Sequence, residues 1–121
     1  ADCGFQSMER QMRDMADNWF HLRYIPLLLK EMDWLCHLKA GFHMKEADTT
    51  EAMKSNTRPV LFFHGEKDTY VYPNNSVQNY MLCKAPKELV IVPGARHLCS
   101  AYADPELYQR TMMEFFKKYD L

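Results

Sequence analysis

An aspartate and a histidine, each placed shortly after an apolar run, are the residues of this chain best suited to act together. Asp68 follows the run 60–63 after a His-Gly turn, and His97 follows the run 89–92 after a Pro-Gly turn. Short apolar runs rich in β-branched and aromatic residues are typical of strands buried on both faces of a parallel sheet. Since parallel strands end at one edge, we expect the two side chains to meet there.

A carboxylate beside an imidazole can orient that imidazole as a general base. We therefore expect Nδ1 of His97 to lie about 2.6 to 3.2 Å from a carboxylate oxygen of Asp68. His64 ends the first apolar run and belongs to the turn, so we expect it to have a structural role. A single Asp or His would be weak evidence for catalysis, but the ordered pair with both glycine turns is a much more specific pattern.

The stretches Pro-Val-Leu-Phe-Phe-His-Gly-Glu-Lys-Asp-Thr-Tyr-Val and Val-Pro-Gly-Ala-Arg-His together resemble the C-terminal part of an α/β-hydrolase. In that family the acidic member of a Ser-His-Asp triad follows the seventh strand in an HGxxDxxV stretch. The histidine follows the eighth strand in a G-x-x-H stretch. Gly65, Asp68 and His97 match these positions, and the order Asp before His agrees with the family. The resemblance implies that His97 is the general base and acid and that Asp68 orients it.

The nucleophile of such a triad is missing from the sequence. No serine of the chain lies in the required G-x-S-x-G pattern, and the oxyanion hole that the resemblance assigns to earlier strands is missing too. The chain also opens with Ala1-Asp2-Cys3-Gly4, which looks like the turn after the family's sixth strand. We expect about half of the parent protein, with the nucleophile, to lie upstream. The serines that fail the pattern are Ser7, Ser55, Ser76 and Ser100.

Three functions fit this pattern. The first is the C-terminal fragment of a serine hydrolase, a carboxylesterase or lipase acting on a small-molecule ester. The second keeps the fold but makes the protein a peptidase, thioesterase or lactone hydrolase, because these enzymes share the same Asp-His end. The third is a non-catalytic interaction module that retains the pattern by descent. A G-x-S-x-G upstream would exclude the third, and a panel of ester and amide substrates would separate the first two.

The elements that must position the pair indicate an α/β fold. We expect two parallel strands at about 59–64 and 88–92, joined by a crossover helix within 73–85 that Pro73 opens and Pro86 ends. Residues 57–121 would then form the C-terminal α/β part. Residues 1–56 would form a helical lid-like or cap-like segment, which in the resembling family grows between the sixth and seventh strands.

Apolar residues at steps of three and four predict the flanking helices. Asp48 and Glu51 form a capping-box pattern before a further short helix that ends near Asn56, and Asp104 should cap the last helix. The apolar positions are Phe5, Met8, Met12, Met15 and Trp19 in the first helix, Ile25, Leu28, Leu29, Met32, Leu35 and Cys36 in the second, and Leu107, Tyr108, Thr111, Met112, Phe115, Phe116 and Tyr119 in the last.

Composition narrows the range of partners. Fifteen basic and sixteen acidic residues are interspersed and give a net charge of −1, so we expect neither a nucleic-acid nor an anionic-membrane partner. The four cysteines form no CxxC pair, which favours reduced thiols and a cytoplasmic location. Cys36, His37 and His43 lie near one another in sequence, but their spacing fits no zinc motif, so we expect neither a metal nor a cofactor.

Assembly follows from the strand count. If the sixth strand ends just before Ala1, one edge of the strand 60–63 lacks its ladder partner, and an unpaired edge is a template for pairing. We therefore expect the chain to bind the N-terminal half of the same protein or a second copy of itself rather than to exist as a stable lone monomer.

Overall fold

The computed structural model describes residues 1–20 and 26–121, which form two compact units. One unit contains residues 1–5 and 51–121, and the other contains residues 6–50. The predicted division at residue 56 therefore differs from the observed one in two places. Residues 1–5 belong with the α/β part because their backbone pairs with its sheet, and residues 51–56 lead into its first strand.

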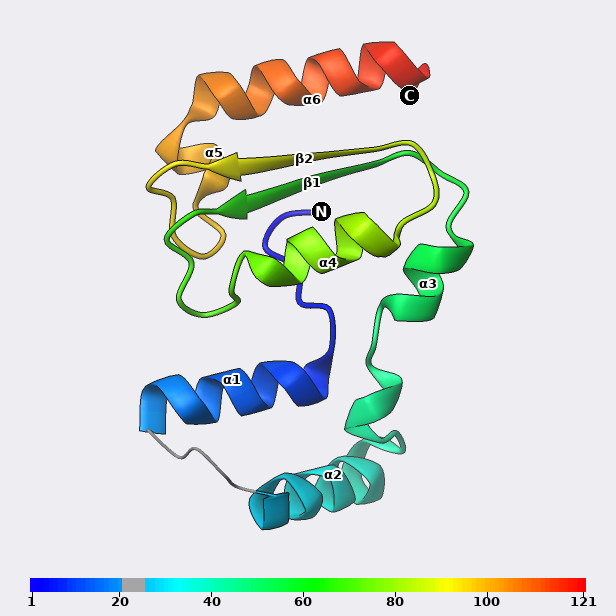
Figure 1. The fold of residues 1–121 in the computed structure, drawn as a ribbon, viewed down its shortest axis with the longest axis vertical. Helices are drawn as coiled ribbons and strands as arrows, with labels where there is room; N and C mark the ends of the chain where they lie inside the picture. Colours follow the sequence, from blue (N-terminus) through cyan, green and yellow to red (C-terminus); the bar gives the residue numbers. More distant parts are fainter. Residues whose placement is uncertain (21–25) are drawn as a thin grey trace. The chain divides into compact units, whose positions relative to one another are not determined.

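The larger unit is built on the predicted pair of parallel strands (Figure 1). Strands β1 (Val60–Gly65) and β2 (Lys87–Val92) pair in register from Val60 opposite Lys87 to Gly65 opposite Val92. The crossover between them is α4 (Asn74–Leu82), and α3 (Thr50–Ser55) precedes β1. Pro73 is the N-cap residue of α4, as predicted, and the helix ends at Leu82, before Pro86.

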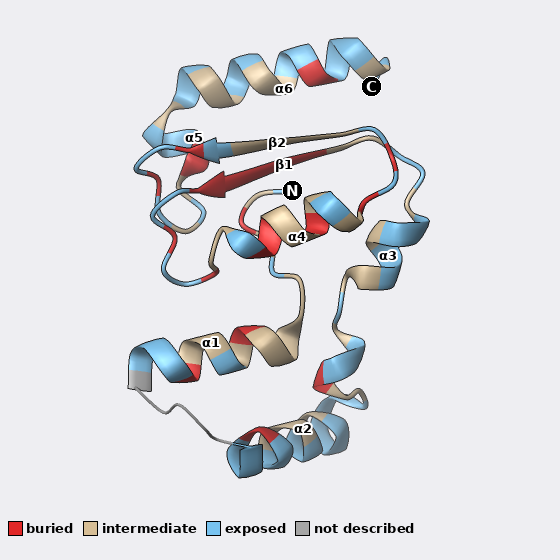
Figure 2. Ribbon diagram, in the orientation of Figure 1, coloured by how far each residue is buried: buried red, intermediate tan, exposed pale blue. Residues whose placement is uncertain are grey.

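Strand β1 is buried on both faces, as its unbroken apolar run predicts (Figure 2). Leu61 and Phe63 face a core shared with Phe115 of α6 (Pro105–Tyr119), whereas Phe62 faces a second core with Cys83. Figure 1 accordingly shows α6 on one side of the sheet and α4 on the other. The strand that carries the site is thus fixed from two sides.

Capping fixes the start of α6 as predicted, since the Asp104 carboxylate accepts a hydrogen bond of 2.9 Å from the Leu107 amide. A short helix, α5 (Ser100–Ala103), lies between the His97 loop and α6. The Asp48 half of the predicted capping box is present. Asp48 accepts from the Thr50 amide at 2.7 Å, but Glu51 forms an ion pair with Lys54 at 2.8 Å.

The prediction that one edge of β1 has no hydrogen-bonding partner is partly wrong. The Cys3 amide donates to the Phe63 carbonyl at 3.0 Å, and the Phe63 amide donates to the Ala1 carbonyl at 2.8 Å. Asp2 therefore forms a parallel bridge with Phe63. Residues 1–3 thus pair with β1 in the way the end of a further strand would. The sequence predicts that this neighbouring strand ends before Ala1.

The smaller unit contains α1 (Met8–Phe20), α2 (Pro26–Ala40) and the 3₁₀ turn η1 (Met44–Glu46). Leu29 is the one residue of α2 that is buried, while Leu28 and Leu35 of the predicted apolar stripe are exposed. Ile25, also assigned to that stripe, lies outside the described residues. Over the described parts of the chain, every helix is too short or too polar to cross a bilayer.

Gly65 ends β1 where the two site loops come closest together. A Cβ atom at this position would lie 2.5 Å from the Ala95 carbonyl oxygen and 2.6 Å from that of Arg96. No side chain fits there unless the backbone of the His97 loop moves. The glycine of the HGxxD pattern is therefore needed for space at this approach.

We predict that Gly65→Ala destabilises the chain by about 1 to 3 kcal/mol, the usual cost of overpacking a close contact. Gly4→Ala is the matched control, because a Cβ there meets no atom within 4 Å. Urea unfolding of both variants would measure the difference. Equal midpoints for the two variants would contradict the steric account.

Candidate active site

The site lies at the carboxyl ends of β1 and β2, where the loops that follow the two strands are hydrogen-bonded to each other. The Glu66 amide donates to the Val92 carbonyl at 3.0 Å, and the Lys67 amide donates to the Ala95 carbonyl at 2.8 Å. The Glu66 carboxylate accepts from the Gly94 amide at 2.9 Å. These bonds fix both loops independently of the side chains of Asp68 and His97.

Asp68 and His97 meet at this edge, as the sequence predicts. Nδ1 of His97 lies 2.8 Å from Oδ2 of Asp68, within the expected range. An ionised carboxylate only accepts hydrogen bonds, so Nδ1 carries the proton and Nε2 has the free lone pair. The Asp68 side chain is fully buried, whereas that of His97 is 29% exposed. The buried carboxylate thus orients the imidazole through Nδ1, and part of the imidazole surface remains exposed to solvent.

Asp68 is surrounded by hydrogen-bond donors. Its Oδ1 accepts from the backbone amides of Tyr70 and Val71, each at 2.9 Å, while Oδ2 faces His97. Burial by itself would raise the pKa of this carboxyl group, but the bond from His97 and those from the two amides lower it below its ordinary value. Asp68 is therefore an anion at neutral pH, as an orienting group for an imidazole must be.

Tyr70 also contacts His97 directly. Its ring lies 4.9 Å from that of His97 between centroids, tilted by 38°. No sequence pattern predicted a role for this tyrosine, although its place two residues after Asp68 could have suggested one. Its ring covers part of the imidazole and restricts the directions from which water or substrate can approach.

Within the larger unit, no serine is placed as a nucleophile for His97. Ser76 and Ser100 are fully buried and hydrogen-bond to His64 and Asp2, respectively. The hydroxyl group of Ser55 is bonded to the Glu51 carbonyl of its own helix, and Ser7 lies in the other unit.

Cys3 lies next to the pair, which the sequence analysis did not predict. Its Sγ and one ligand-type atom each of Asp68 and His97 lie within 4.8 Å of one another. Burial raises the pKa of the Cys3 thiol to about 11, so the sulfur is protonated at neutral pH and is neither a ready nucleophile nor a ready metal ligand. Within residues 1–20 and 26–121, Cys36, His37 and His43 do not form such a cluster.

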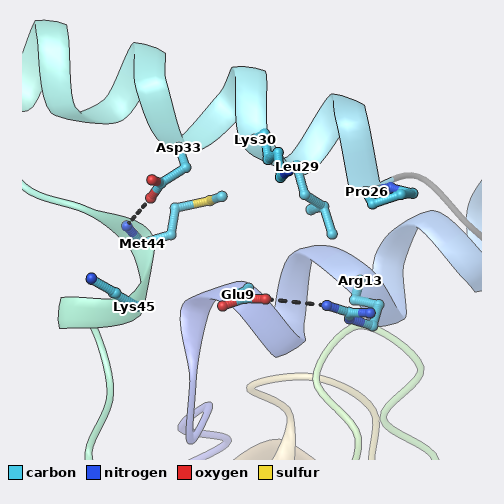
Figure 3. A pocket seen from close by; sticks show the side chains of 8 residues that line it. All are labelled: Glu9, Arg13, Pro26, Leu29, Lys30, Asp33, Met44 and Lys45. Carbon is cyan, nitrogen blue, oxygen red and sulfur yellow. Dashed lines mark hydrogen bonds and ion pairs between the residues drawn. The ribbon is translucent and has the colours of Figure 1, made fainter.

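The smaller unit contains a separate pocket of about 290 Å³ between α1 and α2 (Figure 3). Its charged groups are partly paired: Arg13 bonds to Glu9 at 3.1 Å, and Asp33 accepts from the Met44 amide at 2.7 Å. It holds none of the residues predicted to be catalytic. The lining residues are Glu9, Arg13, Pro26, Leu29, Lys30, Asp33, Met44 and Lys45.

Comparison with solved structures defines the fold class. The chain is similar to the crystal structure of MGS-MChE2, an alpha/beta hydrolase enzyme from the metagenome of sediments from the lagoon of Mar Chica, Morocco. The TM-score is 0.56 at 13% sequence identity, with 96% of this chain and 60% of that chain covered. The fold is therefore that of part of an α/β-hydrolase, and the chain spans less than two thirds of the matched structure.

Comparison with family models gives the family. Residues 2–120 match the model of the prolyl oligopeptidase family, so the chain belongs to that family of serine hydrolases. A search of curated proteins found no match. The family favours a peptidase over the ester hydrolase that the sequence analysis placed first.

The lowered pKa of Asp68 predicts how stability depends on pH. Because the group binds its proton less readily in the folded state, its contribution is fully present above the ordinary pKa of 3.8 and is lost as pH falls through the lower folded value. We expect the difference in unfolding free energy between the chain and its Asp68→Asn variant to be constant near neutral pH and to shrink below about pH 4. Urea titrations at several pH values below about 4 would test this, and a difference that grows as pH falls through that range would contradict it.

Proposed function

We propose that this chain supplies the general base and its orienting carboxylate to a serine peptidase of the prolyl oligopeptidase family. The observation that carries the proposal is the 2.8 Å bond between Nδ1 of His97 and buried, ionised Asp68, which leaves Nε2 free on a partly exposed ring. The serine would come from the N-terminal half of the same protein, outside this chain.

In this mechanism the serine hydroxyl attacks the scissile carbonyl while Nε2 of His97 takes its proton. Asp68 stabilises the imidazolium that forms. His97 then gives the proton to the leaving amine, the acyl-enzyme remains, and a water molecule activated by the same nitrogen releases the acid. Asp68 need not change its protonation state, which suits a carboxyl group with a lowered pKa.

Family membership supports peptide bonds as the substrate class, and the family's name suggests a preference for proline. Ester hydrolysis is the second candidate, because esterases and peptidases of this fold have the same Asp-His pair in their C-terminal part. The two differ in what they require of His97. An amine must be protonated to leave, whereas the phenolate of an activated ester leaves without that proton.

A substrate panel would separate these functions. In the polypeptide that carries both this chain and the nucleophile, we expect cleavage of peptidyl-prolyl p-nitroanilides, slower cleavage of the corresponding alanyl substrates, and kcat/KM lowered about 10³-fold or more by His97→Ala. Met113→Ala is the control, since that side chain is 64% exposed on α6 and belongs neither to the site nor to residues 6–50. The 121-residue chain alone should be inactive. Cleavage of activated esters only would favour the esterase, and no cleavage of either substrate class would favour a non-catalytic module.

We further propose that residues 6–50 act as a lid-like segment for apolar parts of the substrate. Support comes from α2, whose Leu27, Trp34 and Leu38 are all at least 60% exposed although they are large and apolar. We predict that Trp34→Ser with Leu38→Ser raises KM for substrates with large apolar groups and leaves KM for small ones unchanged. An unchanged KM for both substrate sizes would exclude the lid role.

A further inference from the structure

His64 lies directly behind the catalytic carboxylate and is completely buried. Its Nε2 lies 2.7 Å from the Val71 carbonyl oxygen and 3.1 Å from Oδ2 of Asp68. Both neighbours are acceptors, so Nε2 must carry a proton. This proton lies in the bond to Val71 and beside the same carboxylate oxygen that accepts from His97.

The other ring nitrogen fixes the orientation of His64. Nδ1 lies 2.7 Å from Oγ of Ser76 on α4, and that hydroxyl group is buried as well. When the imidazole is neutral, the hydroxyl donates to Nδ1, which leaves Nε2 as the only ring donor. Although Ser76, His64 and Asp68 combine the residue types of a triad, their burial keeps substrate away from this serine.

The two contacts of Nε2 act on one loop. Val71 receives the His64 bond through its carbonyl group and gives its own amide to Oδ1 of Asp68 at 2.9 Å. Residues 68–71 therefore form a short turn, and the hydrogen bond from His64 fixes this turn at Val71. Loss of the donor would leave the Val71 carbonyl unpaired and remove one of the partial positive charges that face Asp68.

We propose that His64 is a positioning residue of the triad, which holds the 68–71 turn through Nε2–H and so keeps Oδ2 of Asp68 on Nδ1 of His97. The turn predicted from the sequence gave His64 a structural role only. A purely structural role would require a side chain of the right size and polarity, whereas this role requires a donor at the Nε2 position.

Two substitutions separate these roles. In His64→Gln the side-chain amide can place a donor near the Nε2 position, whereas in His64→Asn the shorter side chain places its amide near Nδ1 and reaches only Ser76. Both substitutions keep a polar side chain at buried position 64. Ser76→Ala is the matched control, because it removes the Ser76 contact and leaves Nε2–H in place.

The first measurement uses the 15N-labelled chain. The low-field proton signal of His97 Nδ1 reports the bond to Asp68, and hydrogen exchange of the Tyr70 and Val71 amides reports the turn. We expect His64→Asn to broaden or shift the signal and speed the exchange of both amides at least tenfold, while His64→Gln and Ser76→Ala keep both readouts near those of the parent chain. The proposal is overturned if His64→Asn changes neither readout, or if Ser76→Ala changes them as much.

The kinetic measurement rests on the proposed function and uses the polypeptide that carries the nucleophile. We expect His64→Asn to lower kcat roughly tenfold, which corresponds to the loss of about one hydrogen bond, with KM unchanged and with recovery in His64→Gln. A rise in KM alone, or no recovery in His64→Gln, would overturn the positioning role. Absence of activity in the parent polypeptide would overturn the proposed function instead, and the spectra of the chain would still decide the role of His64.

Discussion

The buried negative charge of Asp68 is the constraint on which the rest of the site depends. A carboxylate removed from water is very costly unless donors replace its hydration, and here two backbone amides and one imidazole form hydrogen bonds to it while a second imidazole N–H faces it. These donors come from the loop after β1, the loop after β2 and the end of β1 itself. The charge can be buried only when the two strands are paired and both loops are closed.

The same requirement explains why Gly65 and the loop contacts matter for chemistry as well as for folding. His97 can reach Asp68 only because the carbonyl groups of Ala95 and Arg96 pass within 2.6 Å of where a Cβ of residue 65 would stand. The bonds that join Glu66 and Lys67 to the second loop set the separation of the two strand ends. Sheet packing thus determines the tautomer of His97, because it places an anion opposite Nδ1 and leaves the free lone pair on Nε2.

Much of this site could be predicted from sequence, because its parts are local. The apolar runs, the glycine turns and the capping Asp104 each depend on a few neighbouring residues, and the structure has them as expected. The pairing of residues 1–3 with β1 and the position of Cys3 could not be predicted, since both join residues about 60 or more positions apart without a periodic pattern. The contacts of His64 were missed for a related reason: a histidine that ends a strand has the same sequence signal whether or not it faces a carboxylate.

The helices of the smaller unit show where periodicity stops being informative. The apolar stripe of α2 predicts a buried face, yet Leu28 and Leu35 are exposed and Leu29 alone is buried in that helix. Apolar spacing indicates that a helix has a face to cover and says nothing about what covers it. In the larger unit α6 meets the sheet, and Phe115 is buried at the predicted position. The strand pair at whose edge Asp68 and His97 meet therefore also covers the apolar face of α6.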